Sequence, residues 1–402
     1  MTSSLLLRNA RLLDPATGEY TEGDLRCADG RIAEAGPGPA AADVRTLDLR
    51  GAVVLPGLID AHVHVTASTA DLGSLPAQSP AYAAAQAARI MSGMLDRGFT
   101  TVRDVAGADY GLADAQAEGL FRGPRLLFCG KALSQTGGHG DSRTRGTRVR
   151  DDHPCCAGLS RIADGVDAVR AAARDELRKG AHHLKVMASG GVASPTDRID
   201  STQYSADELR AIVEEAEAAN RYVAAHAYTA RAVNRALELG VRSIEHGNLL
   251  DDRSVELFLA RDAYLVPTLV TYWALKEEGR EHGLPESSWR KVDAVLDAGL
   301  AALERASRGG VKLVYGTDLL GGMHRHQNHE FRLRAEVQSP LEVIRAATST
   351  AADLLNLTGE IGTLAVGAHA DLVVVDGDPL ADVGVLTRPF RHVVQGGEVV
   401  SG

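Results

Sequence analysis

Two histidines separated by one residue are the first sign of chemistry in this sequence. His62 and His64 end a short apolar run that follows Pro56 and Gly57. In a β-strand, residues i and i+2 point to the same face, so both imidazoles could enter one cavity. Neutral imidazole is a common metal ligand. The motif alone also fits two surface histidines at a strand end, so its meaning depends on other residues.

Further side chains with the same potential lie in or just after other apolar stretches. They are His139, Lys185, His226, His246 and Asp318. Each has an ordinary alternative, such as a hydrogen-bonded rim histidine, a lysine whose amine reaches solvent, or a helix-capping aspartate. A metal site follows only if the fold brings these residues to one place.

The elements between these residues predict how they meet. Eight apolar strand candidates lie at 57–64, 100–105, 125–129, 183–188, 222–226, 242–246, 263–269 and 312–318. Alanine-rich helical stretches alternate with them, at 79–97, 164–179, 205–220, 230–239, 252–259 and 289–308. This alternation predicts an α/β fold, a (β/α)8 TIM barrel over residues 57–356, with the active site at the carboxyl ends of the strands. An open doubly wound sheet is the alternative, but no Gly-rich phosphate loop follows a strand.

Both ends of the chain have a different texture. Short strand-like segments separated by turns lie at 5–13, 31–35, 44–49 and 370–376, and a hairpin-like segment lies at 391–400. Such segments are typical of antiparallel sheets. We therefore expect residues 1–56 and 357–402 to form one small β domain.

Composition narrows the class of protein. The 402 residues are 45% hydrophobic and carry a formal net charge of -10, which argues against nucleic acid or an anionic membrane as the main partner. No signal-peptide pattern or membrane-spanning apolar run is present, so we expect a cytoplasmic protein. Of the four cysteines, Cys155 and Cys156 are adjacent. They could form a soft-metal or redox site, but ordinary loop cysteines in a reducing compartment are favoured.

Taken together, the segment Asp60-Ala61-His62-Val63-His64 and the residues Lys185, His226, His246 and Asp318 resemble the amidohydrolase superfamily, binuclear-metal type. The resemblance covers essentially the whole chain and implies a barrel plus a small β-sandwich formed by both termini. It implies that His62, His64 and Asp318 hold one divalent metal. It also implies that His226 and His246 hold a second, and that Lys185, carboxylated on its amine, bridges both. Imidazole and carboxylate ligands suit Zn²⁺, although Mn²⁺, Co²⁺ or Fe²⁺ could substitute.

The same resemblance implies a mechanism. Two divalent ions lower the pKa of a bridging water, so that a hydroxide forms near neutral pH. Asp318 would accept the proton of this water and later deliver it to the leaving nitrogen. His139 or Tyr228 could stabilise the oxyanion by hydrogen bonding.

A narrower resemblance concerns the substrate. The segments 137–140, 189–195 and 226–228 look like the branch that contains Xaa-Pro dipeptidases (prolidases), Xaa-Arg/Lys dipeptidases and imidazolonepropionase-like hydrolases. In that branch, the residues matching His139 and Tyr228 contact the carbonyl or the α-carboxylate of the substrate. Arg143 and Arg198 are further candidates to bind a carboxylate, because a guanidinium pairs with it through two hydrogen bonds. A solvated loop arginine is the commoner case for each.

The predicted function is hydrolysis of the amide C–N bond of a dipeptide or N-acyl amino acid, with an Xaa-Pro dipeptide as the first expectation. A cyclic amide, an imidazolone or a xenobiotic amide such as a mycotoxin N-acyl amino acid is the enzymatic alternative. Lys185 argues against a mononuclear deaminase, since such members generally lack the bridging lysine. A metal-free scaffold ranks third because every ligand position is filled. The partner is a small molecule, and homo-oligomers are common in the family.

Two features, one just after Asp318 and one after the seventh predicted strand, remain open. His324, His326 and His329 lie within six residues and could suggest a third metal, but a flexible loop at the mouth of the pocket is favoured. Tyr272 and Trp273 could be walls of the pocket or ordinary core aromatics.

Overall fold

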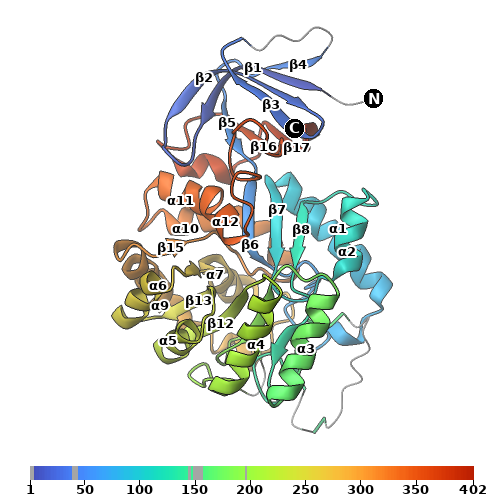
Figure 1. The fold of residues 1–402 in the computed structure, drawn as a ribbon, viewed down its shortest axis with the longest axis vertical. Helices are drawn as coiled ribbons and strands as arrows, with labels where there is room; N and C mark the ends of the chain where they lie inside the picture. The colour runs from blue at the N-terminus through green and yellow to red at the C-terminus, as the bar shows by residue number, and fades with distance from the viewer. Residues whose placement is uncertain (1–3, 39–43, 144–145, 148–156, 195–196) are drawn as a thin grey trace.

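The computed structural model describes residues 4–38, 44–143, 146–147, 157–194 and 197–402. Cys155 and Cys156 lie outside the described residues, so their predicted role as loop cysteines stays a prediction. Figure 1 shows a β-sheet built from both chain ends at the top of the molecule and a mixed α/β region below it.

The strands of the described chain fall into two groups, the terminal sheet and the parallel strands. The terminal sheet contains β1 (Leu5–Leu13), β2 (Tyr20–Ala28), β3 (Arg31–Gly36), β4 (Arg45–Asp48), β5 (Val53–Pro56), β16 (Leu372–Val375), β17 (His392–Gln395) and β18 (Glu398–Ser401). The parallel strands are β6 (Leu58–Val63), β7 (Phe99–Asp104), β8 (Arg125–Phe128), β9 (Ala132–Ser134), β10 (Ser160–Ile162), β11 (Leu184–Met187), β12 (Val223–Thr229), β13 (Ser243–Leu249), β14 (Tyr264–Val266) and β15 (Lys312–Leu313).

Helices connect most of the parallel strands. The α-helices are α1 (Pro80–Asp96), α2 (Tyr110–Ala117), α3 (Val166–Arg178), α4 (Ala206–Ala218), α5 (Ala230–Glu238), α6 (Asp252–Ala260), α7 (Leu269–Glu278), α8 (Glu286–Trp289), α9 (Asp293–Arg308), α10 (Glu330–Arg334), α11 (Pro340–Ala346) and α12 (Ser349–Leu354). Three 3-10 helices are η1 (Leu75–Ala77), η2 (Gly321–His329) and η3 (Val383–Thr387). A capping box at Ser205 and Glu208 begins α4, since each side chain accepts the other residue's backbone N–H.

The two chain ends form one largely antiparallel sheet, in the order β18-β17-β16-β5-β1-β2-β3 with β4 also paired to β1. The predicted C-terminal hairpin is β17–β18. In β1, a bulge lies between Leu7 and Ala10, where Asn9 has a positive φ of 55°. The bulge shifts the alternation by one residue, so Leu7 before it and Leu12 after it pack into the same hydrophobic core. The structure confirms that both ends of the chain contribute strands to one shared β-sheet.

The expected alternation of strands and helices is also confirmed. The parallel strands form two sheets, β6-β7-β8 and β10-β9-β11-β12-β13-β14-β15. Backbone hydrogen bonds join these sheets on both sides: His182 N–H donates to the Phe128 carbonyl (2.9 Å), and Ala61 N–H donates to the Tyr315 carbonyl (2.9 Å). These bonds support the predicted eight-stranded barrel.

Two strands end earlier than the sequence predicts. The strand expected at 263–269 stops at Val266, because Pro267 has no N–H to donate and Thr268 has a left-handed φ of 49°. The strand expected at 312–318 is regular only over Lys312–Leu313. The chain beyond it still reaches β6, where the Asp318 N–H donates to the His62 carbonyl (2.8 Å).

The terminal sheet passes directly into the parallel strands, since β5 continues into β6 through Gly57 (Figure 1). A Cβ at Gly57 would lie 2.1 Å from Thr100 Oγ1, so only glycine fits this close approach. The Gly57 N–H donates to the Asp371 carbonyl (2.7 Å) in the C-terminal part of the sheet. Both chain ends therefore fix the strand that leads to His62 and His64.

Candidate active site

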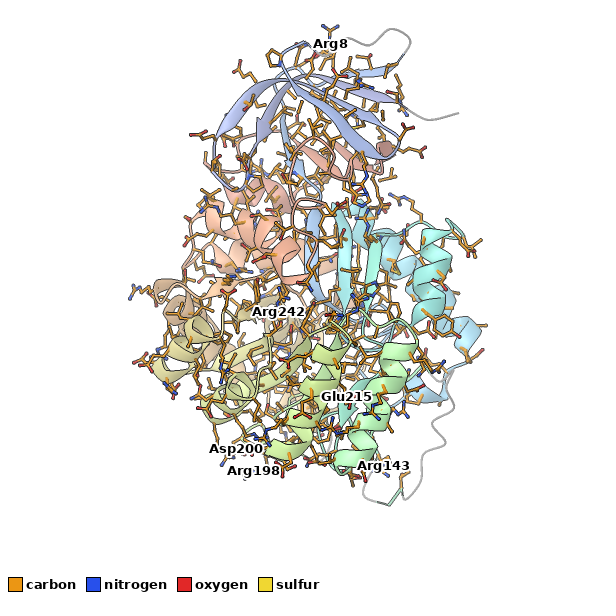
Figure 2. All side chains as sticks on the ribbon, viewed as in Figure 1. Arg8, Arg143, Arg198, Asp200, Glu215 and Arg242 are labelled. Carbon is orange, nitrogen blue, oxygen red and sulfur yellow. The ribbon has the colours of Figure 1, made fainter. Side chains whose placement is uncertain are left out.

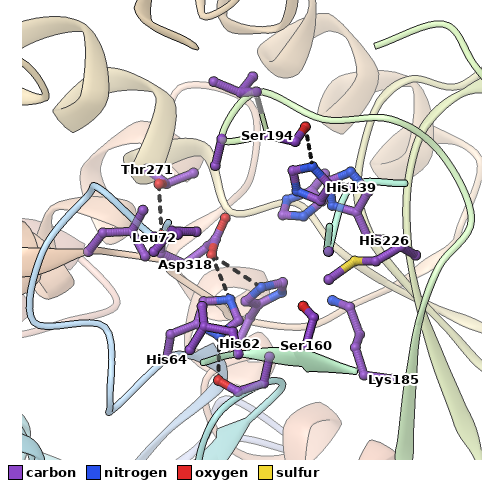
Figure 3. Close-up of a pocket in the computed structure, with 18 of the residues that line it drawn as sticks. His62, His64, Leu72, His139, Ser160, Lys185, Ser194, His226, Thr271 and Asp318 are labelled. Atoms are coloured by element: carbon purple, nitrogen blue, oxygen red, sulfur yellow. Dashed lines mark hydrogen bonds and ion pairs between the residues drawn. The ribbon is translucent and has the colours of Figure 1, made fainter. Parts of the chain in front are cut away.

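A cavity of about 880 Å³, open to solvent, lies where the carboxyl ends of the parallel strands meet. The predicted residues that line it are His62, His64, His139, Lys185, His226, Tyr228, Tyr272, His246 and Asp318. Figure 3 shows several of them around the same space, with the Lys185 amine pointing into it. The structure therefore brings the predicted ligand set together.

Backbone geometry aims two of these side chains. His226 and Tyr228 share a face of β12 by ordinary alternation, as His62 and His64 do at the end of β6. His246 and Asp318 instead have positive φ angles of 75° and 52°. Such angles are uncommon in residues other than glycine, cost of order 1–3 kcal/mol, and cluster at functional sites.

One side of the cavity presents nitrogen lone pairs to a carboxylate. His62 Nδ1 lies 2.7 Å from Glu245 Oε2, and His64 Nδ1 lies 3.0 Å from the Ala106 carbonyl oxygen. These oxygens accept, so each Nδ1 carries the proton and each Nε2 is left with a lone pair in the neutral ring. Both Nε2 atoms face Asp318 Oδ1, at 3.4 and 3.1 Å. Acceptors in such contact repel unless a proton or a cation lies between them, so this set fits a metal ion.

The other side is built from His226 and His246, whose ring centroids are 4.7 Å apart. His226 Nε2 donates a hydrogen bond to the Gly190 carbonyl (3.1 Å). Nδ1 therefore keeps its lone pair and is free to bind a metal. His246 Nδ1 lies 2.8 Å from Thr268 Oγ1. Ligand atoms of His62, His246 and Asp318 all lie within 4.8 Å of one another. Within the described ranges, no other His, Cys, Asp and Glu group meets this criterion.

Burial shifts the pKa values of the side chains that line the cavity. Burial lowers the pKa of the Lys185 amine against the opposing charges of Glu245 and Asp318, which favours the neutral amine. Burial alone would raise the pKa of Asp318. When the His62 and His64 rings carry a proton on Nε2, their charge and hydrogen bonds outweigh burial and hold the pKa of Asp318 well below its usual range. Burial likewise lowers the pKa of His226 and His246 well below the usual value. Both rings are therefore neutral and can bind a metal through a nitrogen lone pair.

His139, Tyr228 and Tyr272 form the wall beside these histidines. The His139 ring stacks on His226 with centroids 4.1 Å apart, and the Tyr272 hydroxyl donates to the Tyr228 hydroxyl (3.2 Å). Burial raises the pKa of both phenols, so Tyr228 stays protonated and can donate a hydrogen bond. Tyr272 is thus a wall of the cavity, whereas Trp273 packs against His326 and His329 outside it.

The two candidate arginines do not line this cavity. Arg143 donates to Asp141 through Nε (2.7 Å) and Nη2 (2.6 Å). The Arg198 side chain is 82% exposed and pairs with Asp200 at 2.8 Å. Figure 2 shows both arginines at the lower end of the molecule, in the view of Figure 1. Their roles in substrate binding stay predictions without support from these contacts.

The histidine-rich segment after Asp318 is the 3-10 helix η2, and its three side chains diverge. His324 Nε2 lies 3.3 Å from the Ala67 carbonyl oxygen, and His326 Nε2 lies 2.9 Å from Glu278 Oε1. His329 packs against Trp273 instead. None of the three belongs to the group of ligand atoms around Asp318.

Sequence reasoning missed the partners that orient the histidines. Glu245 Oε2 accepts from His62, while Glu245 Oε1 pairs with Arg103 Nη2 (2.9 Å), and all three side chains are buried. Asp60 accepts from the Thr317 hydroxyl (2.6 Å), next to Asp318. The sequence shows Glu245 and Asp60 close to the predicted ligands His246 and His62, but it does not show where their side chains point.

Residues 53–400 match the Amidohydrolase family. The chain belongs to this family. A prolidase structure in complex with N-methylphosphonate-L-proline is 49% identical, covers 99% of both chains and superimposes with a TM-score of 0.97. A Xaa-Pro dipeptidase with methionine bound in its active site is 28% identical over 100% of both chains, with a TM-score of 0.88.

Ochratoxinase from Aspergillus niger is 35% identical over 365 residues, which cover 87% of this chain and 76% of the relative. Its structure matches 100% of this chain and 96% of its own, with a TM-score of 0.87. Family and relatives together make this protein a hydrolase. No helix in the described part of the chain has the length and apolar character needed to cross a membrane.

Proposed function

We propose that this protein is a binuclear metal-dependent hydrolase that cleaves the amide bond of dipeptides or N-acyl amino acids, with a C-terminal proline preferred. The observation that carries the proposal is the convergence of histidine lone pairs on Asp318 in a cavity that also receives the Lys185 amine. Similarity to a prolidase over nearly the whole chain supports proline as the leaving group.

The donor set fits two divalent ions, of which Zn²⁺ matches imidazole and carboxylate ligands well. His62 and His64 would bind one ion through Nε2, together with Asp318. His226 would bind the second through Nδ1, together with His246. A carbamate on Lys185 would give one oxygen to each. When bound, two such ions polarise the scissile carbonyl and lower the pKa of a water molecule toward neutrality.

The chain's own residues would then move and hold the protons. Asp318 is ionised at neutral pH because its pKa is low, so it can accept a proton from water and pass it to the leaving nitrogen. Tyr228 keeps its proton and can donate to the carbonyl oxygen or to the α-carboxylate of the substrate. His139 lies beside His226 and would contact the substrate from the neighbouring wall of the cavity.

The shape of the cavity suits an apolar acyl group. Aliphatic side chains line it together with the histidines: Leu72, Leu159, Val192, Leu275 and Leu320. The second candidate substrate is therefore a xenobiotic N-acyl amino acid, and the 35% identity to ochratoxinase favours it. The two candidates differ in the amino acid that leaves.

This proposal includes the finer parts of the fold. The two parallel sheets would close as a (β/α)8 barrel over residues 57–356, and residues 1–56 and 357–402 would form a β-sandwich. A cytoplasmic location and a homo-oligomer remain predictions from the sequence.

The test is a hydrolysis screen of zinc-loaded protein, with a metal count on the same sample and Asp318→Asn as the control for contaminating hydrolases. Substrates are Xaa-Pro dipeptides, N-acyl prolines and N-acyl amino acids with other C-terminal residues. About two metals per chain and preferential cleavage before proline support the first candidate. Preference for another C-terminal residue supports the second. Bound metal without amide cleavage contradicts both, and absence of metal favours a scaffold.

A further inference from the structure

A buried polar network lies beside His139, and its first member, Ser194, also lines the cavity. His139 Nδ1 lies 2.9 Å from Ser194 Oγ, and the Ser194 hydroxyl is also hydrogen-bonded to Asp197 Oδ1. The dashed line in Figure 3 marks the contact between His139 and Ser194. The side chain of Asp197 is only 3% exposed, and its Oδ2 lies 3.9 Å from His139 Nδ1. None of these partners belongs to the proposed metal ligands.

A lysine from a distant part of the chain holds this network. Lys291, between α8 and α9, donates to the carbonyl oxygens of Gly191 (3.1 Å), Ser194 (2.8 Å) and Asp197 (2.9 Å). An ammonium group has three N–H donors, so these acceptors use all of them. Its charge also lies 3.6 Å from Asp197 Oδ1. Lys291 therefore stabilises both the backbone around Ser194 and the buried carboxylate.

Gln203 and Gly191 complete the support. Gln203 Oε1 accepts from the backbone N–H of His139 (2.8 Å), and Gln203 Nε2 donates to Asp197 Oδ2 (2.9 Å). A Cβ at Gly191 would lie 2.1 Å from His139 Cε1, so the ring packs against bare backbone there. The His139 ring is thus fixed by its own backbone, by Gly191 and by Ser194.

The hydrogen bonds assign one proton position. An ionised Asp197 can only accept, so the single proton of the Ser194 hydroxyl points toward it. Ser194 Oγ must then accept from His139, which places a proton on Nδ1. Nε2 is left as the ring nitrogen available to the cavity, and in the neutral ring it accepts a hydrogen bond from the substrate.

We propose that Asp197, held by Lys291, positions His139 through Ser194, so that Nδ1 is protonated and Nε2 meets the substrate. This inference rests on the proposed function only in making the substrate an amide that contacts His139. Ser194, Asp197 and Lys291 are positioning residues, and each acts through His139.

The experiment compares Ser194→Ala, which removes the relay, with the matched variant Ser194→Thr, which keeps a hydroxyl. We expect Ser194→Ala to lower kcat about tenfold to a hundredfold with little change in KM, because misplacing a catalytic group has effects of this size. Metal content should not change, and Ser194→Thr should retain most of the rate. Lys291→Met should resemble Ser194→Ala.

A double-mutant cycle separates this role from general damage. In a His139→Asn background, Ser194→Ala should have no further effect on kcat, since the group through which it acts is gone. A further loss of equal size, or a loss of metal in Ser194→Ala, would overturn the inference.

A second measurement needs no substrate. The ¹⁵N NMR signal of His139 Nδ1 in zinc-loaded protein, assigned by its loss in His139→Asn, should be that of a protonated nitrogen in the wild type and should change in Ser194→Ala. An unprotonated Nδ1 in the wild type would refute the positioning. If the wild type cleaves no amide, the proposed function fails, while this signal still decides the inference.

Discussion

Replacing Glu245 by glutamine tests whether the orientation of His62 is set from behind the metal site. Glu245 serves three partners, since Oε2 accepts from His62 Nδ1 (2.7 Å) and Oε1 accepts from Arg103 Nη2 (2.9 Å) and from the Ser243 hydroxyl (2.6 Å). A glutamine has one carbonyl oxygen and one NH2 group. The buried Arg103 cation needs the oxygen, so the NH2 group must face His62.

Two donors then meet at His62 Nδ1, and the ring relieves the conflict by moving its proton to Nε2. That nitrogen would lose the lone pair that faces Asp318. Partners that fix the tautomer of a metal-binding histidine are typically worth 10–100-fold in metal affinity, or about 1.4–2.8 kcal/mol. The loss of charge opposite Arg103 should also lower stability, by less than the roughly 3–5 kcal/mol seen when a buried pair loses one partner, because the hydrogen bond is kept.

The assay is a zinc competition titration against a chelating dye, with a thermal melt of the metal-free protein. Glu360→Gln is the matched control, since Glu360 pairs with Arg31 at a half-exposed site where an ion pair contributes little. We expect weaker zinc binding and a lower Tm for Glu245→Gln only. A lower Tm with unchanged zinc affinity would show that Glu245 supports Arg103 alone and would refute the role in orienting His62.

Three further variants test other parts of the site and the core. Lys185→Ala should leave well below the roughly two metals expected per chain; unchanged metal and turnover would exclude a bridging role. Tyr228→Phe should lower kcat/KM on the order of a hundredfold with metal content intact, as removal of an oxyanion donor does, and unaltered kinetics would remove Tyr228 from the reaction. Glu330 is buried, accepts from the Val270 N–H (2.7 Å) and has a pKa raised by burial from 4.5 to about 8. Between these values the folded state holds a proton that the unfolded state has lost, so its contribution to stability falls as pH rises. Glu330→Gln should therefore become more stable than the wild type by a few kcal/mol between pH 5 and 8, at about 1.4 kcal/mol per pKa unit, and parallel stability curves from urea titrations would contradict this.

The strands and the convergence of the strand-end histidines on one cavity could be predicted because their signals are local. Apolar runs of suitable length end in His62, His226 and His246, and the alternation of strands with helices places those ends at one edge. The strand β2 was missed because Tyr20–Ala28 is mostly polar and only three of its nine residues are buried. The helix α7 was missed for the opposite reason, since Leu269–Glu278 begins with a buried apolar stretch that is typical of a strand.

The arginine candidates show where local reasoning fails. Arg143 and Arg198 lie in loops near motif residues, but each has an acidic side chain two residues away, Asp141 and Asp200. Such a neighbour can engage the guanidinium without any help from the fold. Proximity in sequence to His139 or Ser194 therefore carries no information about the direction of the side chain.

The partners behind the histidines could not be predicted, because they depend on a broken alternation. In a regular strand, Glu245 and His246 would point to opposite faces, and only one of them could enter the site. The φ of 75° at His246 turns its side chain back, so that His246 and Glu245 both contact His62. Adjacent residues of the strand thus supply a proposed metal ligand, His246, and the group that orients another proposed ligand, His62. The alternation of side chains along a strand cannot predict such a position, because the backbone departs from that alternation there.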